Sequence, residues 1–230
     1  MAQPTGPATF VLVHGAWGGG WVWGRVADRL RAQGHRVFAP TLTGLGERSH
    51  LCSPAVTLTT HVLDVANLVT WENLDGFLLC GHSYGGTVIT GVAERIEPRI
   101  ASIVYLDAFI PADGEAMADI APRRPVPGGT TPAPTGNLFR VNERDCAWVE
   151  AKSTPQPNGA FIEKLTVTGA YQRIPKRAFI RAALYDAPHF RRYYAACKAT
   201  PGWATYEIAA GHMVMLDAPD ELTRILLQLR

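Results

Sequence analysis

Short apolar runs alternate with amphipathic stretches along most of the chain, and this alternation limits the folds that it can adopt. The first two runs end at Gly15 and Pro40, and their length is that of a buried strand. The six expected strands are residues 10–14, 37–39, 77–80, 102–106, 178–184 and 205–209. Strands that alternate with helices pair in parallel through right-handed crossovers. The sequence therefore predicts an α/β fold with a doubly wound, mainly parallel six-stranded sheet.

The stretches between these runs carry apolar residues at every third or fourth position, which is typical of helices. The clearest are residues 22–30, 62–69, 87–96 and 219–229. Gly34 suits the C-cap of the first, and Thr59 or Thr60 suits the N-cap of the second. Pro219 is favourable in the first turn of the last.

One region breaks the alternation. Eight of the 17 prolines fall between residues 111 and 160, and residues 121–136 have the composition of an irregular loop. Short helices are expected around it at 143–149 and 160–167. Because the region is too short for an independent domain, we expect it to cap the strand ends, and a disordered linker is the alternative. The expected division is a core of residues 1–110 and 173–230 and a cap insert of residues 111–172.

The composition and the net charge limit the classes of molecule that the protein is expected to bind. The chain has 230 residues, of which 47% are hydrophobic and 18% charged, and its net charge is +2. Without a run of Lys and Arg, neither nucleic acid nor an anionic membrane is expected as the main partner. No apolar stretch approaches the roughly 20 residues of a membrane span. The first ten residues lack the regions of a signal peptide, so we expect a cytoplasmic protein. We expect its partner to be a small uncharged molecule.

Familiar cofactor motifs are absent from the sequence. The four cysteines form no C-x-x-C pair, so no zinc or redox site is expected. Glycines 18–20 fit neither a phosphate-binding loop nor a dinucleotide-binding turn. We therefore expect no metal and no cofactor.

Residues 81–85, Gly-His-Ser-Tyr-Gly, match the pattern G-x-S-x-G. An apolar strand precedes the pattern and a helix rich in small residues follows it. In that setting the serine occupies a sharp strand-to-helix turn, and the flanking glycines allow the close passage of the chain. The pattern alone often arises by chance, but its context predicts that Ser83 is a nucleophile beside a helix N-terminus, where negative charge is favoured.

A serine nucleophile needs a base, and His212 is the best placed of the seven histidines. It follows the last expected strand and precedes the last helix. His14 ends the first strand and is expected to fix its loop by hydrogen bonding. His82 adjoins the serine, but at such a turn its side chain is expected to point elsewhere.

The oxyanion that forms during acyl transfer needs two hydrogen-bond donors to stabilise it. The backbone N–H of Tyr84, directly after the nucleophile, is expected to supply one. The N–H of Ala16, in the loop after the first strand, is expected to supply the other. An ordinary glycine turn is the alternative for that loop.

Four segments of the chain resemble one family. VLVHGAWGGGWVW, LTGLGE, GHSYGG and GHMVML resemble the α/β-hydrolase superfamily, in particular the branch of small plant methyl esterases, hydroxynitrile lyases and their bacterial esterase relatives. The likeness covers about residues 8–110 and 175–230, and the order Ser…Asp…His agrees with it. The lyases of that branch carry Thr and Lys where this chain has Gly15 and Met213. Because cyanohydrin chemistry needs those groups, the resemblance implies an esterase.

Two aspartates fit as the acid that orients the histidine. In this superfamily the acid usually follows the later strand, which favours Asp186. However, Asp186 lies slightly past the expected strand end, and Pro188 follows closely. The position of Asp107 resembles that of the acid in haloalkane dehalogenases, which follows the earlier strand. At this position a cap would shield the carboxylate from water and so strengthen its effect on the imidazole. We prefer Asp107 and keep Asp186 as the alternative.

Together these expectations predict a serine hydrolase that cleaves a small carboxylic ester through an acyl-enzyme intermediate. The substrate pocket is expected to be apolar and aromatic. Its expected lining is Trp17, Trp21, Tyr84, Phe109, Trp148 and Phe161. The alternatives are a lyase, cyclase or C–C bond hydrolase that uses the same three residues and, in a different class, a ligand receptor with little turnover.

Overall fold

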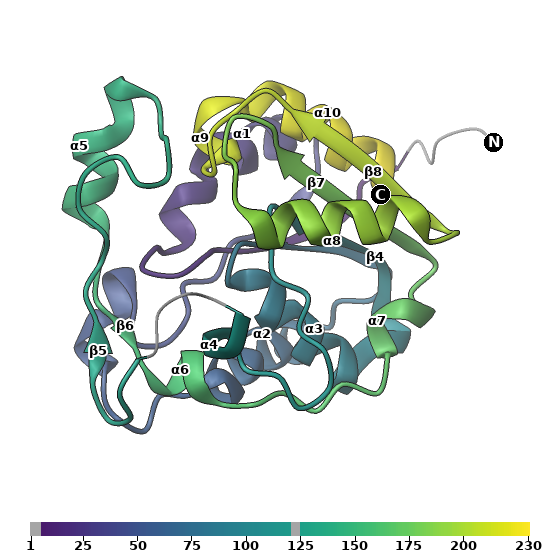
Figure 1. Cartoon of the computed structure of the whole chain (residues 1–230). Coiled ribbons are helices and arrows are strands. Elements are labelled where there is room, and N and C mark those ends of the chain that lie inside the picture. Colours follow the sequence, from purple (N-terminus) through teal and green to yellow (C-terminus); the bar gives the residue numbers. More distant parts are fainter. Residues whose placement is uncertain (1–5, 121–124) are drawn as a thin grey trace.

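The computed structural model describes residues 6–120 and 125–230 of the chain (Figure 1). Six strands form one sheet in the order β2-β1-β3-β4-β7-β8, and every neighbouring pair is parallel. They are β1 (Thr9–Val13), β2 (Arg36–Phe38), β3 (Phe77–His82), β4 (Ile100–Leu106), β7 (Lys176–Ala182) and β8 (Trp203–Ile208). Each strand lies where an apolar run predicted one, so the six-stranded parallel sheet is confirmed.

Helices connect the strands and flank the sheet. The α-helices are α1 (Gly24–Ala32), α2 (Leu58–Trp71), α3 (Gly85–Ile96), α4 (Met117–Ile120), α5 (Glu143–Lys152), α6 (Gly159–Ile162), α7 (Ala170–Arg173), α8 (Pro188–Ala199), α9 (Val214–Asp217) and α10 (Pro219–Leu229). Short 3-10 helices lie at Gly20–Trp23, Gly46–Leu51 and Glu97–Arg99. Among the described residues, no helix is both long enough and apolar enough to cross a membrane.

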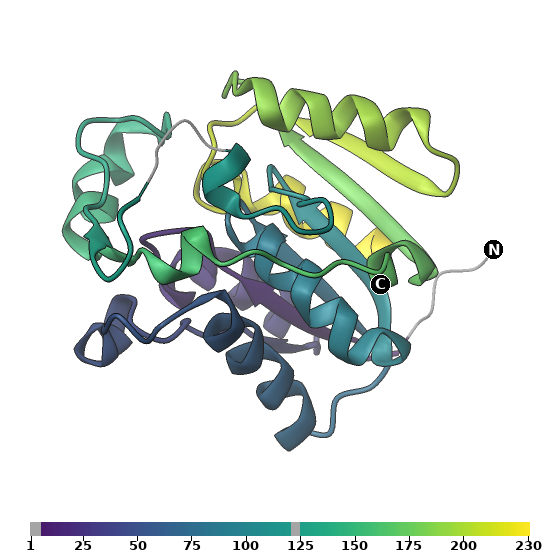
Figure 2. The same cartoon turned by 60° about the horizontal axis from the view of Figure 1, so that its bottom comes forward.

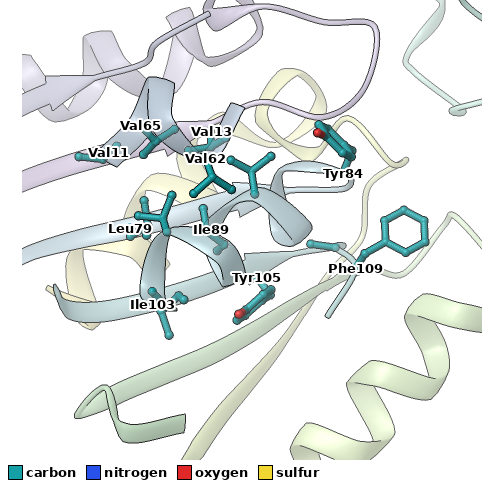
Figure 3. Packing of buried hydrophobic residues seen from close by; sticks show 14 of the residues in the cluster. Val11, Val13, Val62, Val65, Leu79, Tyr84, Ile89, Ile103, Tyr105 and Phe109 are labelled. Atoms are coloured by element: carbon teal, nitrogen blue, oxygen red, sulfur yellow. The ribbon is translucent and has the colours of Figure 1, made fainter. Parts of the chain in front are cut away.

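Two apolar layers cover the sheet, because successive residues of a strand point to opposite faces. In β4, Ile103 and Tyr105 belong to the layer that includes side chains of α2, α3 and α8, and Figure 3 shows part of this layer. Val104 and Leu106 belong to the layer formed with α1, α9 and α10. β3 is buried along its whole length. The turn after β3, which carries Ser83, therefore starts from a strand that is held on both faces.

Residues 111–172, called the insert below, contact the loop after β1 at Trp17 through residues that the structure describes. The backbone N–H of Trp17 donates to Oε1 of Gln156 at 3.0 Å, and its indole N–H donates to the carbonyl oxygen of Thr131 at 3.0 Å. The backbone N–H of Thr154 donates to the carbonyl oxygen of Trp17 at 2.9 Å. Two short antiparallel strands, β5 (Thr130–Thr131) and β6 (Gln156–Pro157), lie in this region, and Figures 1 and 2 both show α5 at the edge of the molecule beside them. The described part of the insert thus forms defined elements that contact the core.

The helix α8 was not predicted. It begins with Pro188 in its first turn, which is a favourable position. Phe190, Tyr193, Tyr194 and Cys197 recur at the spacing of one helix face and belong to or pack against the layer of α2 and α3, so the sequence carried a signal for this helix that the prediction overlooked. Only two of its residues, Phe190 and Cys197, are buried.

Smaller differences concern the ends of elements. The helix expected at 160–167 ends at Ile162, because Glu163 is already extended and its carboxylate accepts hydrogen bonds from the N–H and hydroxyl of Thr59. α2 is capped by Thr57, in a reciprocal pair with Thr60, and not by Thr59 or Thr60. Part of the loop expected at 121–136, residues 121–124, lies outside the described residues.

Candidate active site

Ser83 lies in a strained turn between β3 and α3. Its φ is 53°, in the left-handed region that residues other than glycine rarely adopt. A Cβ on Gly81 would come within 2.5 Å of the carbonyl oxygen of Gly85, so the chain can pass this closely only without a side chain. The N–H of Ser83 donates to the carbonyl oxygen of Leu106 at 3.2 Å, and that of Phe109 donates to the carbonyl oxygen of Ser83 at 3.1 Å. The end of β4 thus supports a turn of the kind that presents a nucleophilic serine.

His212 and Asp107 form a buried pair. Nδ1 of His212 lies 2.7 Å from Oδ2 of Asp107, and the two side chains are 3% and 0% exposed. The backbone N–H of Ala182 donates to Oδ1 of Asp107 at 3.2 Å, so both carboxylate oxygens have a partner. Because the carboxylate accepts the proton of Nδ1, Nε2 is the ring nitrogen left to take up another proton.

Aromatic rings surround the His212 imidazole. The rings of Tyr185 and Phe190 stack on it at centroid distances of 4.6 and 5.2 Å. Burial lowers the pKa of His212 below its ordinary value, and His189 adds to that effect. Burial also raises the pKa of Asp107, while the hydrogen bond from the Ala182 amide opposes this rise. The imidazole is therefore held in its neutral form, which is the form that accepts a proton.

Asp186, the alternative acid, lies at the surface. Its side chain is 66% exposed, and its carboxylate pairs with Arg191 at 3.0 Å. The structure therefore brings Asp107 to His212 and leaves Asp186 in the connection before α8.

The loop after β1 is fixed by His14. The N–H of Leu42 donates to Nε2 of His14 at 3.0 Å, so the ring proton is on Nδ1, which donates to the carbonyl oxygen of Gly15 at 2.7 Å. Burial lowers the pKa of His14 to about 4, so the ring is neutral. The carbonyl and N–H of a trans peptide point in opposite directions, and the bond to Gly15 therefore turns the N–H of Ala16 away from His14. Within the described part of the chain, neither this N–H nor that of Tyr84 donates a hydrogen bond.

A cavity of about 280 Å³ lies at Ser83 and His212. Trp17, Phe109 and Phe161, three of the six expected pocket residues, line it. No Lys, Arg, Asp or Glu side chain among the described residues does so. Nor do the described residues contain a group of three His, Cys, Asp or Glu side chains that could hold a metal.

Tyr84, Trp21 and Trp148 were also expected in the lining, and the structure corrects this expectation. Tyr84 is fully buried, and its hydroxyl lies 2.8 Å from Nδ1 of His61. The rings of Trp21 and Trp148 pack edge to face at 4.8 Å, and the ammonium of Lys152 lies 5.7 and 5.4 Å from the two ring centres. Neither ring borders the cavity. Trp17, whose φ is 62°, precedes the 3-10 helix that carries Trp21 and sends the chain in another direction. The spacing of tryptophans along a loop does not reveal such a change of direction.

The sequence reasoning missed several residues of the cavity wall. Tyr185, His189 and Phe190 come from the start of α8 and the connection before it, and Phe139 comes from the insert. A signal was present in Pro188, because proline is common at the first turn of a helix and an expected helix there would begin beside the active site.

The comparison with known proteins agrees with this fold. The sequence matches the Alpha/beta hydrolase family over residues 10–225. The chain belongs to this family. It is 40% identical to the carbendazim hydrolyzing esterase of Nocardioides sp. (strain SG-4G), over 94% of this chain and 96% of that protein. It is 27% identical to Esterase PIR7B of Oryza sativa subsp. japonica, over 96% of this chain and 94% of that protein.

A solved structure gives a similar result. An extracellular alpha/beta-hydrolase from a Paenibacillus species, described as sharing structural and functional homology with tobacco salicylic acid binding protein 2, superposes with a TM-score of 0.81. The sequences are 27% identical, and the match covers 97% of this chain and 99% of that one. The resemblance of the sequence to plant methyl esterases and bacterial esterases is thereby confirmed.

Proposed function

We propose that this alpha/beta hydrolase is a serine esterase that cleaves a small carboxylic ester through an acyl-enzyme intermediate. The observation that carries the proposal is the 2.7 Å bond between buried Asp107 and His212, on the same cavity as Ser83 in its strained turn. The similarity to the carbendazim hydrolyzing esterase over nearly the full length supports it. We infer a cytoplasmic location from the sequence alone.

In the proposed reaction, Oγ of Ser83 attacks the ester carbonyl carbon while Nε2 of His212 takes the hydroxyl proton. Asp107 accepts the Nδ1 proton in a hydrogen bond, which holds the ring in the required tautomer and stabilises the imidazolium. The N–H groups of Ala16 and Tyr84 donate to the oxyanion. The imidazolium then protonates the leaving alcohol, and a water molecule, activated by His212, releases the acid from Ser83.

The lining of the cavity supports a neutral substrate with an apolar or aromatic part. Burying an unpaired carboxylate among these aromatic walls is costly without a cationic side chain to pair with it. We propose that Trp17, Phe109 and Phe161 contact the substrate, and that the insert caps the cavity and controls which esters enter it.

The lyase alternative is disfavoured by the space at Gly15. A Cβ there would lie 2.9 Å from Nδ1 of His82 and 3.0 Å from Cβ of Ser83, so a threonine would require both neighbours to move. Met213 is only 7% exposed and packs in the layer of α1 and α10. The chain therefore offers neither of the groups that the resemblance links to cyanohydrin cleavage.

The test is hydrolysis of p-nitrophenyl acetate, with carbendazim as a second substrate. Ser83→Ala should lower kcat by about 10⁴-fold or more with little loss of folding, because nucleophile and base act as a unit. Ser53→Ala, at an exposed serine, is the matched control and should keep full activity. A fluorophosphonate should label Ser83 alone. Full activity in Ser83→Ala would refute the proposal, and binding of esters without turnover in the unaltered protein would point to the receptor.

A further inference from the structure

The loop that carries His212 lies directly against the insert. The backbone N–H of His212 donates to the carbonyl oxygen of Phe139 at 2.9 Å. The Phe139 ring also contacts the imidazole, at a centroid distance of 5.4 Å. A Cβ on Gly211 would collide with the carbonyl oxygen of Arg140, so the two backbones meet without a side chain between them.

The carboxylate of Asp217 joins the loop that carries His212 to the insert. Oδ2 of Asp217 accepts the backbone N–H of Gly211 at 3.0 Å. Oδ1 of Asp217 accepts both the backbone N–H of Asn142, at 3.1 Å, and its side-chain amide, at 2.7 Å. Asn142 is the N-cap of α5, so its position also sets where that helix begins. Asp217 thus ties the residue before His212 to the start of α5.

A second contact, between Arg25 of α1 and Asp145 of α5, holds the insert against the core independently of Asp217. Both terminal nitrogens of Arg25 bind the carboxylate of Asp145, at 2.6 and 2.7 Å, and Nη1 also donates to the carbonyl oxygen of Leu216 at 2.8 Å. Arg25 lowers the pKa of Asp145 to about 2, so the pair stays charged at neutral pH. Loss of the Asp217 carboxylate should therefore loosen the His212 loop while α5 remains attached to the core.

We propose that Asp217 is a positioning residue for His212, which couples the insert to the base of the reaction. This inference rests on the proposed role of His212 as the base. Proton transfer is sensitive to position, because a misplacement of about 1 Å can cost roughly 100-fold in rate. Binding of the substrate depends instead on the apolar walls of the cavity. Asp217 should therefore act on kcat and leave KM nearly unchanged.

The test compares three variants of the full chain. Asp217→Ala removes both acceptors and should lower kcat for p-nitrophenyl acetate by about 10- to 100-fold, with KM changed less than about threefold. Asp217→Asn keeps one oxygen for Asn142 but turns an amide toward Gly211, so its kcat should be intermediate. Asp220→Ala is the matched control and should leave kcat unchanged, because among residues 6–120 and 125–230 this exposed carboxylate pairs with Arg29 alone.

The pH profile separates positioning from a general loss of stability. The groups that face the imidazole are Asp107 after β4, His82 of β3, Tyr185 before α8 and His189 of α8. A loosened loop admits water to the ring, so the pKa of His212 should rise toward its ordinary value. The acid limb of kcat/KM should move up by about half a pH unit or more in Asp217→Ala and stay in place in Asp220→Ala.

Active sites are counted by fluorophosphonate titration, so that kcat refers to folded enzyme. The inference is overturned if Asp217→Ala keeps the kcat per titrated site and the acid limb of the unaltered protein, even if its Tm is lower. That result, together with an inactive Ser83→Ala, leaves the esterase proposal intact. An active Ser83→Ala would instead remove the basis of both.

Discussion

Replacement of Asp107 by Asn tests the geometry around the base most directly. The N–H of Ala182 donates to Oδ1 of Asp107, so the single oxygen of an asparagine is drawn to that side. Its NH2 group then takes the place of Oδ2 and faces Nδ1 of His212. Nδ1 must become an acceptor, and the ring proton moves to Nε2. In that tautomer Nε2 cannot take the proton of Ser83.

The size of the effect follows from this change of tautomer. An Asp-to-Asn exchange of this kind in a serine triad costs about 10⁴-fold in kcat. At about 1.36 kcal/mol for each factor of ten, that corresponds to roughly 5.4 kcal/mol of transition-state stabilisation. Asp186→Asn is the matched control, since its exposed pair with Arg191 is of the type worth about 0–1 kcal/mol and does not reach His212. Its kcat should fall less than about tenfold.

Both variants are measured with one ester at neutral pH, after circular dichroism shows that each is folded. The reasoning about the acid is refuted if Asp186→Asn is the crippled variant and Asp107→Asn stays within about tenfold of the unaltered protein. The later-strand arrangement would then hold in solution.

Three further predictions concern the base, the cavity wall and the reaction type. Burial lowers the pKa of His212, the proposed base, below the ordinary histidine pKa of about 6.5. We therefore expect kcat/KM to stay constant as the pH falls from about 8 to about 6.5. A fall in kcat/KM with an apparent pKa of about 6.5 or higher would contradict the argument from burial. Phe161→Leu should change the ratio of kcat/KM between a benzoate and an acetate ester by about tenfold or more. Trp148→Leu, outside the cavity, should leave this ratio unchanged. Equal changes of the ratio in both variants would show that the cavity wall is wrongly assigned. Mandelonitrile should release no cyanide above the uncatalysed rate, because Gly15 and Met213 replace the groups that this cleavage needs, and release that disappears in Ser83→Ala would disprove this.

The sheet could be predicted because its signal is local. Each buried strand of a parallel sheet is apolar on both faces, as β3 is, and needs no knowledge of its neighbours. The turn at Ser83 was equally visible, because a strand, two glycines and a helix all lie within a few residues. His212 was predicted as the base from its place between the last strand and the last helix, and the structure puts it on the same cavity as Ser83.

The sequence favoured Asp107 through a resemblance, but it could not decide between Asp107 and Asp186. β4 and β7 are neighbours in the sheet, so both strand ends lie near the same edge. The decision depends on the left-handed φ of 43° at Asp107 and on the bond from Ala182, which lies 75 residues away along the chain. The expectations for Trp21 and Trp148 were wrong for a related reason, because the direction of a loop side chain depends on long-range packing. The helix α8 is a different case, since its apolar residues have helical spacing and were overlooked.

The position of Asp107 has a consequence for how this enzyme can diversify. Asp107, the proposed orienting acid, follows β4 in the buried middle of the sheet, and the connection of residues 183–187 takes part in none of the proposed reaction steps. That connection and the first turn of α8 nevertheless supply Tyr185, His189 and Phe190 to the cavity wall. Substitutions in residues 183–192 can therefore change the substrate range while Asp107 itself is retained. Changes at Tyr185, His189 or Phe190 also alter the surroundings of the His212 imidazole, so residues 183, 184, 186 and 187 are the positions that vary most independently of the proposed base.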